Sequence, residues 1–369
     1  MKFKMKCTLC ISLIALPFLG LTQNCYKFVD GLASFKAELN NSIDNNVPGF
    51  ALQLLHKDST VLSFTSGKAN LTTGTLINQE TPFYIASVAK TMTAAAVLLL
   101  SQERKLKLQD YVHQYISGLP SATKSIRIYH LLTHLSGLPD YYDIYGENLQ
   151  DFYNKNVLEF AYEIDSLKFE PGVSYSYSNT AYVLLALIVE KISRQTLSEF
   201  LNTRFFNPLG MHQTRVIDKP GLLPEDRAIG YKVDSNGSYS VLDYEGVYTT
   251  GAGGVYSTTE DLKKWILGLN NGKILSKRNV QLMFDFPTTY SGAKSYFGMG
   301  WNNESYGPKT PDINGLKSYG SFGVMKGFRS AIILFPDIEL TIILLGNSTQ
   351  LDLLSQKVIK HFIRKSEGL

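Results

Sequence analysis

A serine and a lysine stand three residues apart near the start of an apolar segment, FYIASVAKTMTAAAVLLL (residues 83–100). On a helix, Ser87 and Lys90 would lie on the same face. A serine hydroxyl is a weak nucleophile until a base removes its proton, and a lysine surrounded by apolar side chains loses its own proton more easily. The alternative is a helix-capping serine followed by a lysine that reaches solvent, and these two residues alone favour that alternative.

A tyrosine and an asparagine follow in YSYSNTAYVLL (residues 175–185), just before a second apolar segment. On extended backbone, Tyr177 and Asn179 would point to the same side, so a phenol and an amide could face one cleft. The alternative is that Asn179 caps the following helix and Tyr177 packs in the core.

Three glycines interrupt the strand-like segment SYGSFGVMKGFRSAIILF (residues 318–335). Glycines inside strands often mark a place where a ligand approaches the backbone, so Gly320, Gly323 and Gly327 suggest a binding edge. The alternative is a glycine-rich turn without a chemical role.

Two further patterns indicate what the protein does not use. His130 and His134 have the i, i+4 spacing of a zinc-binding helix, but the glutamate of H-E-x-x-H and a third ligand are missing, so no metal is expected. The sequence also lacks a G-x-S-x-G elbow, which argues against an α/β-hydrolase. No organic cofactor is predicted.

The apolar patterns predict strands near both ends of the chain and helices between them. Residues 48–66 form one expected hairpin, and Ser330–Phe335 with Leu340–Leu345 form another. Helices are expected over Ala94–Leu100, Ala181–Ile192, Glu199–Phe206 and, at the end, the amphipathic stretch Leu351–Arg364.

Hairpins at both ends favour an α+β fold with one antiparallel sheet. The sheet-forming part is expected over about 28–110 and 245–369, flanked by helices. A mostly helical insertion is expected over about 111–244, with the active site in the cleft between the two parts. The insertion is not expected to fold alone.

The first 23 residues combine Lys2, Lys4 and Lys6 with a short apolar run, which is typical of a secretory signal peptide. The alternative is an uncleaved membrane anchor. Cleavage would remove three lysines and no acids, so the formal charge would fall from +4 to +1, and nucleic acid is not an expected partner. Cys25 would be the only remaining cysteine and could carry a lipid, although Asn24 fits such a site poorly.

The three clusters, in this order, resemble the serine β-lactamase and penicillin-binding-protein superfamily, and most closely its class C β-lactamase-like branch. That branch uses Ser-x-x-Lys, Tyr-x-Asn and then Lys-, His- or Trp-x-Gly. Further matching phrases are IYHLLTHLSGLPDY, FEPGVSYSYSN, FNPLGM, GAGGVYSTTEDLKKW and FGMGW, so the resemblance covers about residues 30–347. It implies a β-lactamase/transpeptidase-like fold.

The resemblance also implies roles. Ser87 would be the nucleophile that forms an acyl-enzyme, and Lys90 and Tyr177 would share the proton transfers, with Tyr177 the favoured base. Asn179 would bind Lys90 and the substrate amide. The backbone N–H groups of Ser87 and Val324 would form the oxyanion hole.

One position departs from the pattern, because the third motif reads Ser321-Phe322-Gly323. Ser321 stands where the branch has a lysine, histidine or tryptophan that helps to bind a substrate carboxylate. Lys326 and Arg329 could replace that charge, although the expectation from their position at a turn is that they face solvent.

We therefore predict that the protein is an exported serine hydrolase, periplasmic or extracellular, whose N-terminus could anchor it to a membrane. Its substrate would be a small molecule or a peptide, as for an esterase or a D-amino-acid peptidase or carboxypeptidase. A β-lactamase and a non-catalytic penicillin-binding-like protein remain as alternatives. Its oligomeric state is not predicted.

Overall fold

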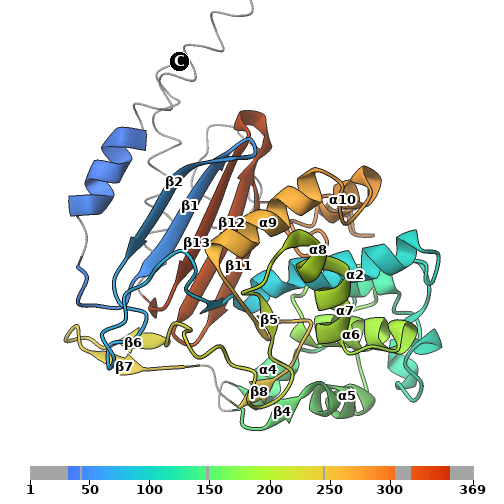
Figure 1. Cartoon of the computed structure of the whole chain (residues 1–369). Helices are drawn as coiled ribbons and strands as arrows, with labels where there is room; N and C mark the ends of the chain where they lie inside the picture. Colours follow the sequence, from blue (N-terminus) through green and yellow to red (C-terminus); the bar gives the residue numbers. More distant parts are fainter. Residues whose placement is uncertain (1–31, 42–43, 147–148, 244–245, 304–316, 350–369) are drawn as a thin grey trace, which may run out of the picture.

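The centre of the fold is one six-stranded antiparallel sheet with the strand order β10-β11-β12-β13-β1-β2 (Figure 1). The computed structural model describes residues 32–41, 44–146, 149–243, 246–303 and 317–349. The strands are β1 (Phe50–His56), β2 (Ser59–Ser66), β10 (Asn302–Asn303), β11 (Tyr319–Met325), β12 (Phe328–Phe335) and β13 (Leu340–Gly346). Because β1 pairs with β13, the two ends of the chain close into one sheet, which confirms the predicted α+β fold and both hairpins.

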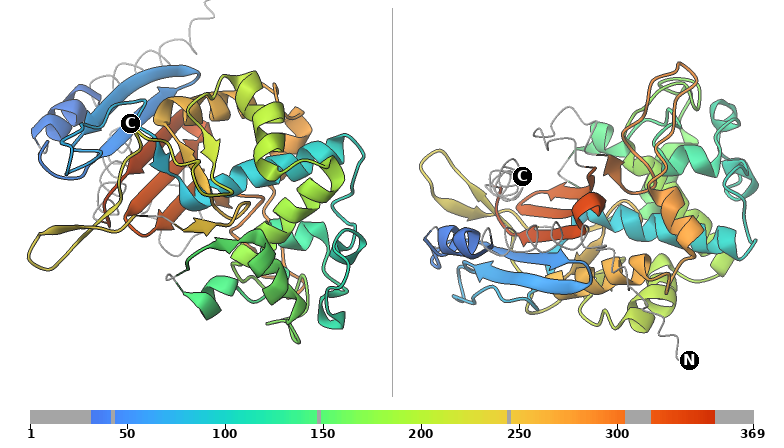
Figure 2. Two further views of the ribbon diagram at one scale, coloured as in Figure 1. Left: turned by 60° about the horizontal axis from the view of Figure 1, so that its bottom comes forward. Right: turned by 90° about the horizontal axis from the view of Figure 1, so that it is seen from above.

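Both faces of this sheet are covered. Alternate residues of the strands, such as Ile342 and Leu344, pack with Phe35 and Leu39 of the helix over residues 32–41. Their neighbours, such as Ile343, belong to the larger core on the opposite face, where the remaining helices lie (Figures 1 and 2). Burial on both faces explains why β1, β12 and β13 contain long apolar runs.

The middle of the chain is mostly helical, as predicted. Its α-helices are α2 (Lys90–Gln102), α3 (Ile128–Leu132), α4 (Tyr141–Tyr145), α5 (Asn154–Tyr162), α6 (Asn179–Ser193), α7 (Leu197–Leu201) and α8 (Asn207–Leu209), followed later by α9 (Thr259–Asn270) and α10 (Lys277–Met283). Four short helical segments accompany them: η1 (Ala86–Ala89), η2 (Val112–Gln114), η3 (Ser121–Thr123) and the π-helix η4 (Asn202–Phe206).

Short strands lie among these helices and were not predicted. They are β3 (Phe83–Tyr84), β4 (Phe152–Tyr153), β5 (Arg215–Val216), β6 (Tyr231–Val233), β7 (Tyr239–Val241), β8 (Val247–Tyr248) and β9 (Val255–Ser257). Each has only two or three residues, too few to show a period-2 pattern in the sequence. The strand β3 pairs with β9, and this pairing fixes the backbone directly before Ser87.

Helix α2 is buried along almost its whole length and packs against α6. A helix that is apolar on all sides needs such complete burial, so α2 and α6 form a rigid core beneath the site. No helix in the described part of the chain has the length and apolar composition that crossing a membrane requires. The predicted signal peptide over residues 1–23, Cys25 and the predicted helix Leu351–Arg364 lie outside the described residues.

Candidate active site

Ser87 lies in the short helix η1, which leads directly into α2. No side chain caps either helix, so Ser87 is not the capping residue of the alternative interpretation. Ala86, directly before it, has a φ of 45°, a left-handed conformation that a non-glycine residue rarely adopts outside turns and functional sites. The backbone around Ser87 is therefore held in an unfavourable conformation by its surroundings.

Lys90 does not reach solvent, since only 1% of its surface is exposed. Its Nζ lies 3.2 Å from Ser87 Oγ, 2.8 Å from Asn179 Oδ1 and 2.7 Å from the carbonyl oxygen of Ala252. An ammonium group has three donors, and these three acceptors satisfy all of them. The lysine is thus a buried polar group aimed at the serine.

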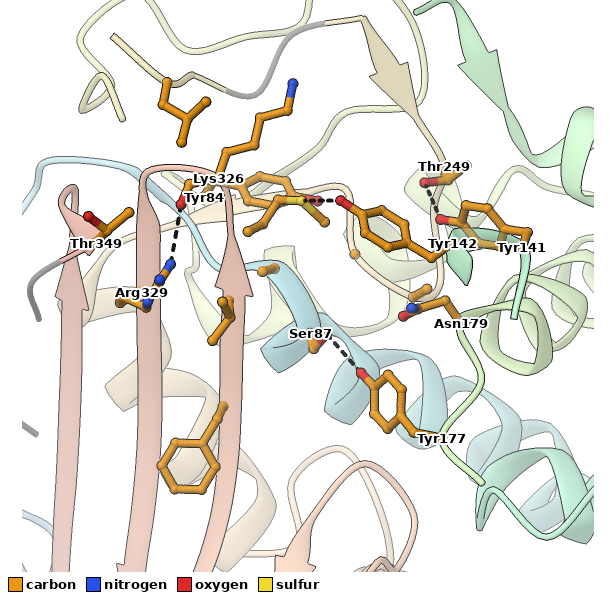
Figure 3. Close-up of a pocket in the computed structure, with 17 residues that line it drawn as sticks. Tyr84, Ser87, Tyr141, Tyr142, Tyr177, Asn179, Thr249, Lys326, Arg329 and Thr349 are labelled. Carbon is orange, nitrogen blue, oxygen red and sulfur yellow. Dashed lines mark hydrogen bonds between the residues drawn. The ribbon is translucent and has the colours of Figure 1, made fainter. Parts of the chain in front are cut away.

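Tyr177 also contacts the serine, and its hydroxyl donates to Ser87 Oγ at 2.9 Å (Figure 3). The N-cap of α6 is Ser178, whose hydroxyl accepts from the N–H of Ala181. Asn179 is therefore free of the capping role and turns its amide towards Lys90. The structure brings Ser87, Lys90, Tyr177 and Asn179 together from two segments about 90 residues apart.

Burial controls the charge state of these groups. Burial lowers the pKa of Lys90 to about 7, and the carboxylate of Asp140 opposes this shift in part. Burial also raises the pKa of the Tyr177 phenol, and the hydrogen bond with Ser87 reduces that increase. In the resting site, Tyr177 is therefore a neutral phenol, whereas Lys90 can lose its proton near neutral pH.

Asp140 is a buried member of the site that the sequence did not single out. One of its carboxylate oxygens accepts from both the backbone N–H and the side-chain Nδ2 of Asn179, at 3.1 and 2.9 Å. Because a carboxylate only accepts hydrogen bonds, it holds the NH₂ end of the amide and turns the carbonyl oxygen towards Lys90. Asp140 belongs to the segment IYHLLTHLSGLPDY, which resembles the family. However, no spacing rule connects Asp140 with Asn179.

The third cluster contributes its backbone more than its side chains. A Cβ atom on Gly323 would lie 2.2 Å from the carbonyl oxygen of Ile85, so this glycine allows β11 to pass close to the segment before Ser87. The approaching group is therefore the protein's own backbone rather than a ligand. Val324 is 59% exposed and lines the pocket beside Ser87. Ser321 is buried and is not among the described residues that line the pocket.

The pocket next to Ser87 has a volume of about 640 Å³ (Figure 3). Tyr142 of α4 and Met325 of β11 form a contact across it, with the hydroxyl 3.3 Å from the sulfur. Lys326 and Arg329 are partly buried and both line the pocket, and Nη1 of Arg329 donates to the carbonyl oxygens of Lys326 and Phe328 at 3.2 and 2.9 Å. None of the described lining residues is acidic.

The two histidines considered as zinc ligands have other partners. Nδ1 of His130 accepts from the N–H of Arg127 at 3.2 Å, and Nδ1 of His134 accepts from the N–H of Ser178 at the same distance. In the described ranges, no group of three or more side chains of the types His, Cys, Asp and Glu is arranged to hold a metal ion.

The fold and this site define a serine hydrolase of the superfamily that contains serine β-lactamases and penicillin-binding proteins. The family model described as Beta-lactamase matches residues 29–357, and the chain belongs to that family. Penicillin-binding protein 4* of Bacillus subtilis (strain 168) is 31% identical over 310 residues, which cover 80% of this chain and 67% of the relative. Protein flp of Staphylococcus aureus (strain NCTC 8325 / PS 47) is 25% identical over 312 residues, which cover 82% of this chain and 60% of the relative.

Solved structures agree with the fold. The octameric penicillin-binding protein homologue from Pyrococcus abyssi has a TM-score of 0.73 and 26% identity, covering 87% of this chain and 74% of that one. The D-amino acid amidase from Ochrobactrum anthropi SV3 has a TM-score of 0.74, and the match covers 93% of this chain and 97% of that one. At 23% identity, this second likeness concerns the fold alone.

Proposed function

We propose that the protein hydrolyses an ester or an amide through an acyl-enzyme formed on Ser87. The observation that carries this proposal is the position of Ser87 Oγ, which lies within hydrogen-bond reach of both Lys90 Nζ and Tyr177 Oη beside an open pocket. A nucleophile with two proton-transfer groups at these distances meets the geometric requirement for activated attack on a carbonyl.

In the proposed reaction, Ser87 Oγ attacks the carbonyl carbon and its proton passes to neutral Lys90, either directly or through the Tyr177 hydroxyl. The tetrahedral intermediate then expels the alcohol or amine, which takes up that proton through Tyr177. Water attacks the acyl-enzyme in the same way and releases the acid. We favour Lys90 over Tyr177 as the base because burial lowers the pKa of Lys90 to about 7 and raises that of Tyr177.

The backbone N–H groups of Ser87 and Val324 are the proposed oxyanion hole. The close passage of β11 by Ile85, which Gly323 makes possible, supports this assignment, because it holds the strand against the segment that carries Ser87. The side-chain amide of Asn179 has two N–H donors, and one of them donates to Asp140. We assign the other N–H to the substrate.

The pocket lining supports a substrate with an acidic group and an apolar part. Lys326 and Arg329 supply positive charge, and the side chains of Tyr142, Phe322 and Met325 supply apolar surface. An ester or a D-amino-acid peptide with a free carboxylate fits this description. A β-lactam has the same two features, and β-lactamase activity is the second candidate, favoured by the family match over residues 29–357. We place the enzyme outside the cytoplasm because of its basic and apolar first 23 residues.

The proposal is tested by labelling the protein with a fluorophosphonate and with a fluorescent penicillin, followed by intact mass measurement and turnover of p-nitrophenyl acetate. We expect one covalent adduct on the wild type and none on Ser87→Ala. Labelling by both probes with penicillin turnover identifies a β-lactamase, whereas labelling with ester turnover alone identifies an esterase or peptidase. Absence of any adduct together with no ester turnover contradicts the proposal and favours a non-catalytic binding protein.

A further inference from the structure

His134 contacts the backbone on both sides of Tyr177. Its carbonyl oxygen accepts from the N–H of Ser176 at 3.0 Å, and its Nδ1 accepts from the N–H of Ser178 at 3.2 Å. One residue thus holds both peptide neighbours of Tyr177. The residue itself has a φ of 55°, a left-handed conformation just after helix α3 that turns its carbonyl and its ring towards the same segment.

The imidazole ring also packs directly against the tyrosine. The ring centroids of His134 and Tyr177 are 4.4 Å apart, and Phe297 lies at 4.3 Å from the imidazole. Because His134 is fully buried, this packing restricts the direction in which the Tyr177 ring can turn. Backbone and ring contacts together therefore fix the position of the hydroxyl that reaches Ser87.

A simple space-filling role does not explain a histidine here. Since Nδ1 accepts a hydrogen bond, the ring proton of the neutral imidazole is on Nε2, and this buried atom has no hydrogen-bond partner among the described residues. A buried donor without a partner is unfavourable, and a leucine would avoid it. Burial and the nearby Lys90 both lower the pKa of His134, so the ring stays neutral and Nδ1 stays an acceptor.

We propose that His134 is a positioning residue for the reaction, which holds the Tyr177 hydroxyl against Ser87 through the two backbone hydrogen bonds and the contact between the two rings. This inference rests on the proposed function, because it assigns to Tyr177 a part in proton transfer. It adds a residue that acts through Tyr177 and does not touch the substrate.

The test compares two variants of the full chain. His134→Leu keeps the volume but removes the acceptor, and we expect the rate constant of fluorophosphonate labelling and the kcat for p-nitrophenyl acetate to fall about 10- to 100-fold, because small displacements of a reacting group cost this much. KM should change less than about threefold, since the pocket lining is unchanged. His134→Asn places an oxygen acceptor near the Nδ1 position, and we expect it to recover about tenfold of the loss.

His130→Leu is the matched control, because His130 is also buried and also accepts a backbone N–H through Nδ1, but its partner is Arg127. We expect this variant to lower the melting temperature without changing the labelling rate of the folded protein. A crystal structure of His134→Leu provides a readout that needs no activity, namely the distance between Tyr177 Oη and Ser87 Oγ, which is 2.9 Å in the wild type.

The outcomes separate the two proposals. If the wild type forms no adduct and shows no turnover, the proposed function and this inference both fail. If the wild type reacts, and folded His134→Leu and His134→Asn react at the wild-type rate, only the inference is overturned. It is also overturned if His134→Leu is slow but His134→Asn recovers nothing, or if Tyr177 keeps its distance from Ser87 in the variant. If His134→Leu does not fold, the labelling rate of His134→Asn is compared with that of His130→Leu. A slower rate for His134→Asn supports the inference, and equal rates overturn it.

Discussion

Two regions of the pocket differ in how firmly their polar groups are held. The inner corner, formed by Ser87, Lys90, Tyr177 and Asn179, is a dense hydrogen-bonded group resting on two buried helices. The outer rim, formed by the pocket-lining residues Phe322, Val324, Met325, Lys326 and Arg329, is more open, since Val324 is 59% exposed and the others are only partly buried. The inner corner keeps the family's residue pattern, whereas the departure at Ser321 lies at a buried position next to the outer rim.

The difference follows from the cost of burial. A buried polar group needs all of its partners, so removal of one member of the inner corner leaves the others unsatisfied. At the outer rim, water can replace a lost partner, so residues there can change with less effect on the rest of the site. We therefore assign the chemistry to the inner corner and the choice of substrate to the outer rim.

The largest expected effect is at Lys90, where one change should affect both the activity and the pH dependence of stability. Lys90→Met removes the proposed base, and we expect kcat/KM for p-nitrophenyl acetate to fall about 10³-fold or more. The variant also leaves Asn179 and Ala252 without a donor and removes an amine whose pKa is lowered by burial, so its free energy of unfolding relative to the wild type should change with pH.

The direction of that change can be derived from the lowered pKa of Lys90. Between about pH 7 and the ordinary pKa of 10.5, the unfolded chain binds more protons at this site than the folded protein, so wild-type stability gains from rising pH. The free energy of unfolding of Lys90→Met relative to the wild type should therefore be highest below pH 7 and fall as the pH rises above it, as measured by thermal unfolding at several pH values. A difference that grows with pH contradicts the burial of an amine with a lowered pKa.

The second effect concerns Asp140, which accepts two hydrogen bonds from Asn179 of the inner corner. Asp140→Asn removes the negative charge that raises the pKa of Lys90, so the acidic limb of the kcat/KM profile should move below pH 7. We also expect the plateau to fall about 10-fold, because the orientation of Asn179 is less fixed. Asp143→Asn, at an exposed position that pairs with Lys168, is the control and should leave the limb in place. An unmoved limb in folded Asp140→Asn means that Lys90 is not the titrating base.

A smaller effect is expected at the outer rim. The double change Lys326→Met and Arg329→Met removes the two cations found among the described residues of the pocket lining. We expect KM for an ester that carries a carboxylate to rise about tenfold, while kcat/KM for neutral p-nitrophenyl acetate changes less than about twofold. Equal losses for the two esters would mean that the outer rim does not select for charge.

The smallest effect is expected at Ser321. Because this side chain is buried and lies outside the pocket lining, Ser321→His should not restore binding of a carboxylate, and acylation by penicillin should change less than about threefold. Labelling rates of the variant and the wild type provide the measurement. A rise of tenfold or more would show that this position alone had lost carboxylate recognition.

Much of the fold could be predicted because its strands and helices have clear apolar patterns. The two hairpins and the helices α2 and α6 are long enough for such a pattern to appear, and all four form as expected. The short strands, such as β3 and β9, have two or three residues and form only because they pair with each other across more than 170 residues of sequence. Contacts of this kind leave no local signal.

The sequence by itself determined which residues could do the chemistry, because Ser87 and Lys90 are three residues apart and Tyr177 and Asn179 only two. Spacing within a segment fixes which side chains share a side, and the ordered motifs indicated the family. The tertiary structure alone decided how far Lys90 is buried. It also decided that Asp140 contacts Asn179, that His134 contacts Tyr177, and that Lys326 and Arg329 line the pocket. These facts depend on distant segments packed around one another, and hydrogen bonds and desolvation between such segments exist only once the sheet has closed.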